Sequence, residues 1–295
     1  MKYKQTFEDR CFSIFSYAFV VFVVAVTLYP MIYVFSMSIS DPVSVTRGEV
    51  FFLPKGFSLK AFKTVVNNSE LWRYYYNTIW YTVVGTVLNV IVTALAAYPL
   101  SRRTFRPRKF FTIFYTITMF FGGGLIPTYI VVTRYLSLYN SRWAVILPTL
   151  TAVWYIIIAR SFFENLPEEL FECARLEGAS EYRILAQIVV PLSKPVLAVL
   201  ALYNGVAHWN SYFEAMIYLG KQELHPIQIY LRRVVIQASP EAMANMDAGA
   251  LGDGILAMMQ VKYAVIVVAV LPIIMIYPFL QRFFVKGLLV GGVKG

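Results

Sequence analysis

Long apolar runs alternate with short polar segments along the whole chain. Residues 11–40 carry no charged side chain, and residues 74–101 form a second uncharged run of similar length. A transmembrane helix needs about 20 consecutive, mostly apolar residues. Further runs approach or exceed that length. The pattern therefore predicts six membrane-spanning helices, approximately at residues 11–40, 74–101, 110–133, 143–160, 195–219 and 260–281.

The composition agrees with this pattern. Hydrophobic residues make up 59% of the 295 positions and charged residues only 14%, whereas soluble proteins average about 25% charged residues. We therefore expect an all-α membrane protein that forms one transmembrane domain over residues 1–295. The run at residues 11–40 is longer than the apolar core of a signal peptide, which has about 7–15 residues. We expect it to be a retained first helix.

The distribution of basic residues predicts the orientation. Residues 102–109, RRTFRPRK, contain five basic side chains between the second and third runs. Short loops rich in Lys and Arg stay on the cytoplasmic side of a membrane. This places both termini in the cytoplasm. It also explains the net charge of +10 better than nucleic-acid binding does, and we expect no nucleic-acid partner.

Two spans carry features that are unusual for lipid-facing helices. Gly122, Gly123, Gly124 and Pro127 interrupt the third span, which predicts a broken helix packed against protein. The fifth span carries polar or amphipathic side chains at Asn204, His208, Trp209, Asn210 and Tyr212, followed by Glu214.

Polar groups at membrane depth are costly and usually face a bundle interior or a water-filled cavity. We therefore interpret Asn204, His208, Trp209, Asn210 and Tyr212 as candidate residues of a translocation path. For His208 a purely structural hydrogen bond between helices is an equal alternative. Glu214 is also consistent with a position at the external interface.

Residues 165–193 form the main polar segment in the second half of the chain. Pro167 suits a helix start, and Glu168 and Glu169 complement the positive helix N-terminus. Gly178 is typical of a helix end, and Ser180 is a favourable cap for a second helix. The pattern predicts a helix, a turn and a second helix on the cytoplasmic side. Leu170, Phe171 and Ala174 would form the apolar stripe of the first helix.

This segment also carries a motif with specific spacing. Its residues are Glu172, Cys173, Ala174, Gly178, Ile188, Val190 and Pro191, with Cys173 in an alanine position and Val190 in a leucine position. In order and spacing they resemble the EAA signature of permease subunits of ABC importers. The resemblance implies that the segment is a coupling helix that docks on an ATPase. It assigns ATPase coupling to Glu172, Cys173, Ala174, Arg175, Gly178, Ile188 and Pro191.

The basic, glycine-rich tail RFFVKGLLVGGVKG is similar to that of type I sugar importers related to the maltose system, and the GGGLIPTY and HWNSYF stretches resemble permeases for oligosaccharides. The resemblance implies a multi-pass subunit of the bacterial cytoplasmic membrane. Its expected partners are a second permease, two ATPase subunits and an extracytoplasmic solute-binding protein. No cofactor is expected on this chain, because ATP and magnesium would bind to the partner ATPases.

Other functions fit the sequence less well. An ABC permease for amino acids or another small solute is the main alternative, followed by an ion-coupled secondary transporter, for which only His208 and Glu214 could serve as coupling residues. We expect no catalytic residue and no metal site. Arginines predicted to be external could favour acidic oligosaccharides, although contacts with the binding protein or lipid headgroups explain them equally well: Arg47, Arg134, Arg142, Arg232 and Arg233.

Overall fold

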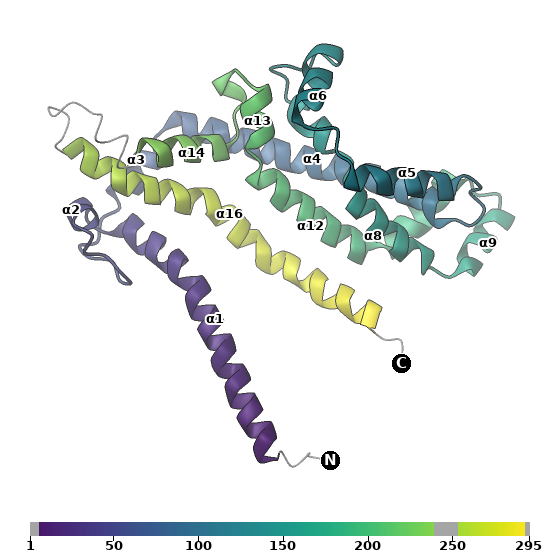
Figure 1. Ribbon diagram of the computed structural model, residues 1–295, viewed down its shortest axis with the longest axis horizontal. Coiled ribbons are helices and arrows are strands. Elements are labelled where there is room, and N and C mark those ends of the chain that lie inside the picture. Colours follow the sequence, from purple (N-terminus) through teal and green to yellow (C-terminus); the bar gives the residue numbers. More distant parts are fainter. Residues whose placement is uncertain (1–5, 239–252, 293–295) are drawn as a thin grey trace. The chain divides into compact units, whose positions relative to one another are not determined.

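The computed structural model describes residues 6–238 and 253–292, and throughout these ranges the regular structure is helical (Figure 1). The backbone forms two compact units. One comprises Met1–Ser69 and Leu231–Leu271, and the other comprises Glu70–Tyr230 and Pro272–Gly295. That residues 1–295 form a single permease domain stays a prediction.

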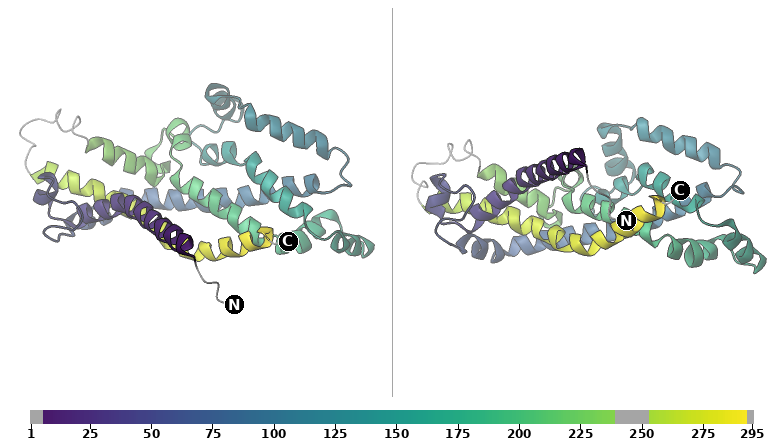
Figure 2. Two further views of the ribbon diagram at one scale, coloured as in Figure 1. Left: turned by 60° about the horizontal axis from the view of Figure 1, so that its bottom comes forward. Right: turned by 90° about the horizontal axis from the view of Figure 1, so that it is seen from below.

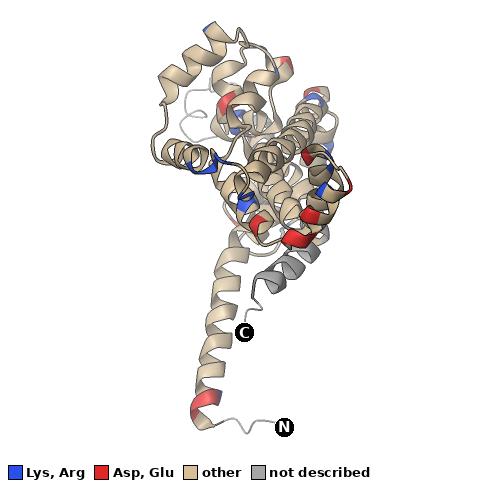
Figure 3. Cartoon of the chain, turned by 90° about the vertical axis from the view of Figure 1, so that its right-hand side faces the viewer, with Lys and Arg blue, Asp and Glu red and all other residues tan. Residues whose placement is uncertain are grey.

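The first unit contains α1 (Phe7–Ile39), α2 (Pro42–Thr46), α3 (Lys60–Val66) and the first part of α16 (Asp253–Gly292). Helix α1 is uncharged beyond its first turn (Figure 3). Its apolar side chains are exposed along most of its length. Only Ser36, Met37 and Ser38 are buried in it. An exposed apolar helix of this length is typical of a span that contacts lipid.

The second unit follows the chain through a series of shorter helices around one long helix, α4 (Figure 2). Its elements are α4 (Ser69–Ser101), α5 (Arg108–Phe120), α6 (Leu125–Ile130), a π-helix (Val131–Tyr135), α7 (Trp143–Ile146), a 3₁₀-helix (Leu147–Thr149), α8 (Val153–Glu164), α9 (Glu168–Leu176), α10 (Glu181–Ile184), a π-helix (Leu185–Val189), α11 (Val190–Leu192), α12 (Lys194–Asn210), α13 (Phe213–Tyr218), a 3₁₀-helix (Gln222–Leu224) and the start of α14 (Ile227–Gln237).

The predicted spans are recognisable in these helices. Among the described residues, three helices are long and apolar enough to cross a membrane alone, and up to six spans result if each bent pair counts as one. The third predicted span is broken as expected: α5 and the helix from Leu125 to Tyr135 meet at 111° around the three glycines. The expected packing of this break against protein is not found within the described part of the chain, because neither α5 nor α6 has a buried residue and the three glycines are exposed. Residues Ile227–Gln237 form α14.

Two predicted spans differ in detail. The fourth bends by 53° between Trp143–Thr149 and Val153–Glu164, a break that the uncharged run did not indicate. The fifth, expected at residues 195–219, stops at Asn210 and resumes as α13 at Phe213. Helix α16 is helical to Gly292. The side chains of the tail from residue 279 lie outside the described part of the structure.

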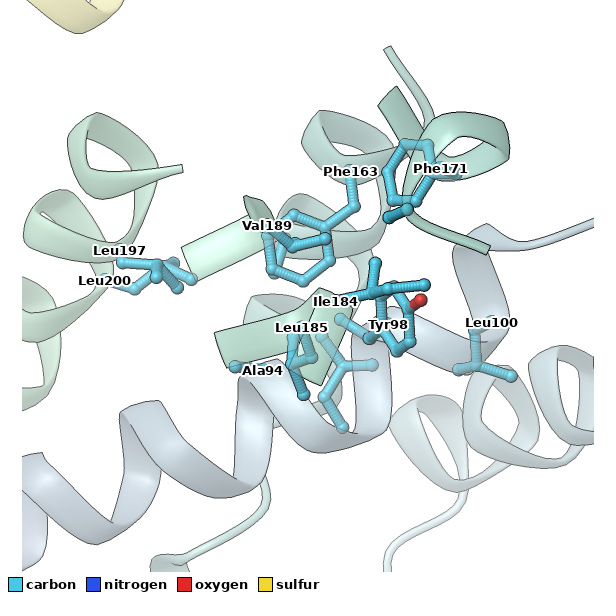
Figure 4. Packing of buried hydrophobic residues seen from close by; sticks show 14 residues of the cluster. Ala94, Tyr98, Leu100, Phe163, Phe171, Ile184, Leu185, Val189, Leu197 and Leu200 are labelled. Atoms are coloured by element: carbon cyan, nitrogen blue, oxygen red, sulfur yellow. The ribbon is translucent and has the colours of Figure 1, made fainter. Parts of the chain in front are cut away.

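Helix α4 is the scaffold of the second unit because segments far away in sequence are fixed along it. Near its start, the Asn77 amide donates to the carbonyl oxygens of Glu223 and His225 at 2.7 and 3.1 Å. The Tyr81 hydroxyl donates to the Leu224 carbonyl oxygen at 2.8 Å. Near its end, α4 contributes to an apolar cluster with α8, α9, α10 and α12 (Figure 4).

Candidate functional site

The polar segment after α8 folds as two short helices joined by a tight turn. Helix α9 follows Pro167 and ends at Leu176, and Gly178 has φ +76°. This left-handed conformation is favourable only for glycine and, less so, for Asn or Asp. The Ser180 hydroxyl then accepts a hydrogen bond from the Arg183 backbone N–H at 3.4 Å and caps α10. The predicted start, turn and cap are all confirmed.

One face of α9 is buried within the chain itself. Phe171 is fully buried and Ala174 is nearly so, and both belong to the apolar cluster that includes Tyr98 and Phe163 (Figure 4). Phe171 and Ala174 belong to the predicted apolar stripe. Residues three apart share a helix face, so Ala174 points with Phe171 into the permease.

The opposite face of the segment is open. Glu172 and Cys173 are exposed, as is Pro191 further along, whereas Ile188 is only half-buried against the cluster. Leu176 is 89% exposed. A large apolar side chain in that position at the end of an anchored helix is unusual and suits a contact with another protein. Sequence reasoning did not single out Leu176, although its position between two charged residues was a usable signal.

Arg175 was expected to present its charge to a partner, but the guanidinium is already paired. It contacts the Glu181 carboxylate at 3.2 Å and the Glu168 carboxylate at 3.7 Å. The Tyr98 hydroxyl, on α4, donates a hydrogen bond to the other oxygen of Glu181. Arg175 therefore connects the two short helices with each other and, through Glu181, with α4.

Arg102 follows directly after α4 and is 5% exposed, although it opens the basic stretch that predicts a solvated loop. Its guanidinium donates to the Phe163 carbonyl oxygen, approaches the Glu168 carboxylate at 3.3 Å and lies 3.9 Å from the centre of the Phe171 ring. Burial lowers the pKa of Arg102 and Glu168 opposes that shift. Arginine nevertheless remains charged, because its ordinary pKa is above 12.

A cavity of about 360 Å³ lies at the other functional candidate, between α4, α8, α12 and α13. Asn204, His208, Asn210 and Tyr212 line it, in agreement with the residues singled out from sequence. Trp209 does not line it; its ring is buried and packs edge-on against Tyr75 of α4, with the ring centres 6.2 Å apart. Neighbouring positions on a helix point about 100° apart, which separates Trp209 from His208.

Helix α4 supplies a cavity residue that the sequence did not indicate. Asn89 is 1% exposed, and its amide nitrogen donates to the Thr149 carbonyl oxygen at 3.0 Å. Its amide oxygen lacks a hydrogen-bond partner among the described residues. A buried polar atom without a partner is expensive, and Asn89 is one of the residues that line the cavity. Asn89 follows Leu88 in an apolar helix, and that isolated amide was the available signal.

The remaining lining residues define the chemistry of the cavity. Hydroxyl and aromatic groups come from Thr149, Tyr155 and Ser211, and the Ser211 hydroxyl donates to the Glu214 carboxylate at 2.6 Å. None of the residues that line this cavity is Lys or Arg. The surface therefore offers hydrogen bonds, ring faces and the Glu214 carboxylate to a polar ligand.

Helices α4 and α12 approach each other closely beside this cavity. A Cβ atom on Gly85 would lie 2.6 Å from Nε2 of His208. The His208 ring therefore occupies the space that a side chain at position 85 would fill. The His208 ring thus packs α12 against α4, and the same residue lines the cavity.

Arg142, one of the arginines considered for acidic substrates, has a packing role. Its guanidinium donates to the Asn77 amide oxygen at 3.0 Å and lies 5.0 Å from the Trp80 ring centre. Arg134 is exposed. Arg142 is therefore engaged in packing within the chain, a role that differs from both interpretations of these arginines.

Comparison with known proteins assigns the family. Over residues 3–290 the chain matches the family described as binding-protein-dependent transport system inner membrane component. It is 36% identical over 289 residues to the polygalacturonan/rhamnogalacturonan transport system permease protein YtcP of Bacillus subtilis, covering 98% of this chain and 100% of the relative. It is 38% identical to the protein LplC of the same organism, covering 98% and 97%.

A solved structure agrees with the sequence relatives. It is described as a bacterial ABC transporter involved in the import of the acidic polysaccharide alginate, and its matching chain shares 35% identity and a TM-score of 0.87, with 96% of this chain and 100% of that chain covered. The expected type I importer permease fold is therefore confirmed. The chain belongs to the family of inner membrane components of binding-protein-dependent transport systems, and is a membrane permease subunit of an ABC importer.

Proposed function

We propose that this permease imports oligosaccharides and that the cavity on α4 and α12 is part of its translocation path. The observation that carries the proposal is the cavity itself. It places amides, hydroxyls and aromatic rings between helices that the sequence assigns to the membrane, and it leaves the Asn89 amide oxygen unpaired. Sugar hydroxyl groups are suitable partners for such a surface, and relatives are named for polysaccharide and oligosaccharide transport.

The segment 165–193 is proposed as the contact with an ATPase. Its exposed face carries Glu172, Cys173 and Leu176. Gly178 forms the turn, and the buried Ala174 packs the segment against the rest of the chain. In this proposal both ends of the chain and this segment lie in the cytoplasm. A second permease completes the pathway, two ATPase subunits bind ATP and magnesium, and an extracytoplasmic binding protein delivers the sugar.

The substrate class needs an assay with matched sugars. Relatives named for polygalacturonan, rhamnogalacturonan and alginate make oligosaccharides of acidic sugars the first substrates to test. The cavity of this chain provides no Lys or Arg to bind their carboxylates. If acidic substrates are imported, their charge must be compensated by another subunit or by groups outside this cavity.

The test is purification of the complex from its native membrane, followed by reconstitution into vesicles. We expect an ATPase and a sugar-binding protein to co-purify, and ATP-dependent uptake of labelled acidic or neutral oligosaccharides. Uptake of amino acids in place of sugars would replace the proposed substrate class. Absence of an ATPase would refute the proposed assembly.

The cavity is tested separately by Asn89→Leu, which keeps the side-chain size but removes the amide. One hydrogen bond to a buried polar ligand is worth about 1–3 kcal/mol, so uptake should fall roughly tenfold while the complex still assembles. Thr93→Val is the matched control, since the Thr93 hydroxyl is also buried and unpaired on α4 but does not line the cavity. Normal uptake by Asn89→Leu would remove this residue from the path.

A further inference from the structure

The polar contacts beneath the coupling segment, residues 165–193, form a closed chain that begins and ends on α4. The Tyr98 hydroxyl donates to Glu181, Glu181 pairs with Arg175, Arg175 pairs with Glu168, and Glu168 pairs with Arg102. Tyr98 and Arg102 are one helical turn apart at the end of α4, and the Arg102 guanidinium lies 5.9 Å from the Tyr98 ring centre. We call this set of five residues the polar ring.

Arg102 is the buried member of the ring, and its position joins three elements. It follows α4, donates to a carbonyl oxygen of α8 at Phe163, and covers the Phe171 ring of α9 at 3.9 Å. A buried charge is tolerated only when it is paired and hydrogen-bonded. Any shift of α9 relative to α4 must therefore move Arg102 with it or break several of its contacts at once.

The polar ring is not needed merely to hold α9 against α4. Exposed ion pairs contribute little to stability, the carboxylates of Glu168 and Glu181 are more than half exposed, and an apolar cluster already joins α9 to α4 through Phe171, Ala174 and Ala97. What the hydrogen-bonded contacts add is direction, because each hydrogen bond fixes distance and angle. Three of the four links are hydrogen bonds, from Tyr98 to Glu181, from Arg175 to Glu181 and from Arg102 to Glu168, so they orient α9 and α10 on α4.

The same helix leads from the ring to the cavity. Asn89 lies on α4 about 14 Å from Tyr98, at a rise of 1.5 Å per residue, and Gly85 contacts His208 one turn further. On the proposed function, on which this inference rests, an ATPase moves the coupling segment. We propose that the polar ring transmits that movement to α4 and so to the cavity, with Arg102 as the positioning residue.

The experiment measures the coupling ratio, the sugar taken up per ATP hydrolysed, by the complete importer in vesicles. The variants are Arg102→Met, which removes the buried charge, and Tyr98→Phe, which removes one hydroxyl group and keeps the ring packing. Arg103→Met is the matched control, because it makes the same change at the next residue, which is exposed. Arg102→Lys keeps the charge but cannot reproduce the contacts of a planar guanidinium.

We expect Arg102→Met to lower the coupling ratio roughly fivefold or more, at the lower end of usual coupling between sites. Tyr98→Phe and Arg102→Lys should lower it less, and Arg103→Met should leave it unchanged. The ATPase should co-purify with each variant. If the Arg102→Met variant does not assemble, the coupling ratio of the Tyr98→Phe variant tests the inference.

The outcomes separate this inference from the proposed function. A wild-type chain that purifies without an ATPase would refute the proposed function. A wild-type importer that works, together with wild-type coupling ratios in assembled Arg102→Met and Tyr98→Phe variants, would refute the ring alone. A lower yield of assembled importer, with a wild-type coupling ratio in the fraction that assembles, would show a purely structural role of Tyr98 and equally overturn the inference.

Discussion

At the end of α4 the charged side chains are paired with one another, whereas in the middle of the same helix an amide oxygen is left without a partner. Glu168, Arg175 and Glu181 bond within the coupling segment and to α4, but the buried amide oxygen of Asn89, a residue that lines the cavity, has no hydrogen-bond partner among the described residues. Paired polar groups fix the relative orientation of helices. Unpaired buried groups are costly unless a ligand or water binds them. The difference agrees with the proposed mechanical role of the first region and the proposed binding role of the second.

Replacing Leu176 by Asp should have the largest effect on the mechanical region. Leu176 is 89% exposed at the end of α9, and an apolar side chain at the centre of an interface contributes about 2 kcal/mol or more. The permease should fold and insert but bind its ATPase at least roughly 30-fold more weakly. Co-purification from membranes measures this, with Leu176→Met as a control that keeps the contact. Full ATPase binding by Leu176→Asp would place the interface elsewhere.

Gly85→Val should be the most damaging change beside the cavity. Its Cβ would lie 2.6 Å from His208 Nε2, so α4 and α12 must separate or His208 must move. Overpacking of this kind costs about 1–3 kcal/mol. Thermal unfolding in detergent and sugar uptake should both report it. Gly205→Ala, where the new Cβ would meet Thr86 at an ordinary 3.6 Å, is the matched control. Equal stability of the two variants would contradict the predicted clash.

Gly178 tests whether the shape of the turn matters independently of contacts. A side chain there meets nothing within 4 Å, yet φ is +76°. The expected cost for Val is about 1–2 kcal/mol of conformational strain, with reduced ATPase binding and uptake. Asn tolerates this conformation better, so Gly178→Asn should remain close to wild type. If Val and Asn behave alike in co-purification and uptake, strain at this position is unimportant.

Labelling of the native Cys173 reports whether this face of α9 is covered, without a substitution in the segment. It is exposed on α9 beside Glu172, so in a Cys11→Ser background a maleimide should label it slowly in the assembled importer. Stripping the ATPase from the membranes should restore rapid labelling. Rates that do not depend on the ATPase would mean that this face of α9 is not covered.

Sequence alone determined the class of protein, the approximate positions of the spans and the helix–turn–helix structure of the coupling segment. These follow from short-range properties: runs of apolar residues, a glycine at φ +76°, a serine cap before α10 and the Gly-rich break between α5 and α6. Each depends on neighbours in the chain and is therefore readable from residue order. The polar residues Asn204, His208, Asn210 and Tyr212 were found in the same way, because they interrupt an apolar run.

Tertiary structure decided which faces these elements present. Ala174 and Arg102 occur in segments that look solvated, yet α4 and α8 cover both. Asn89 joined the cavity only because α4 passes α12 at Gly85, and Trp209 was turned away from it towards Tyr75. Some of these contacts join residues more than a hundred positions apart, as for Gly85 and His208. The pattern of one helix does not specify which other helices its faces will contact.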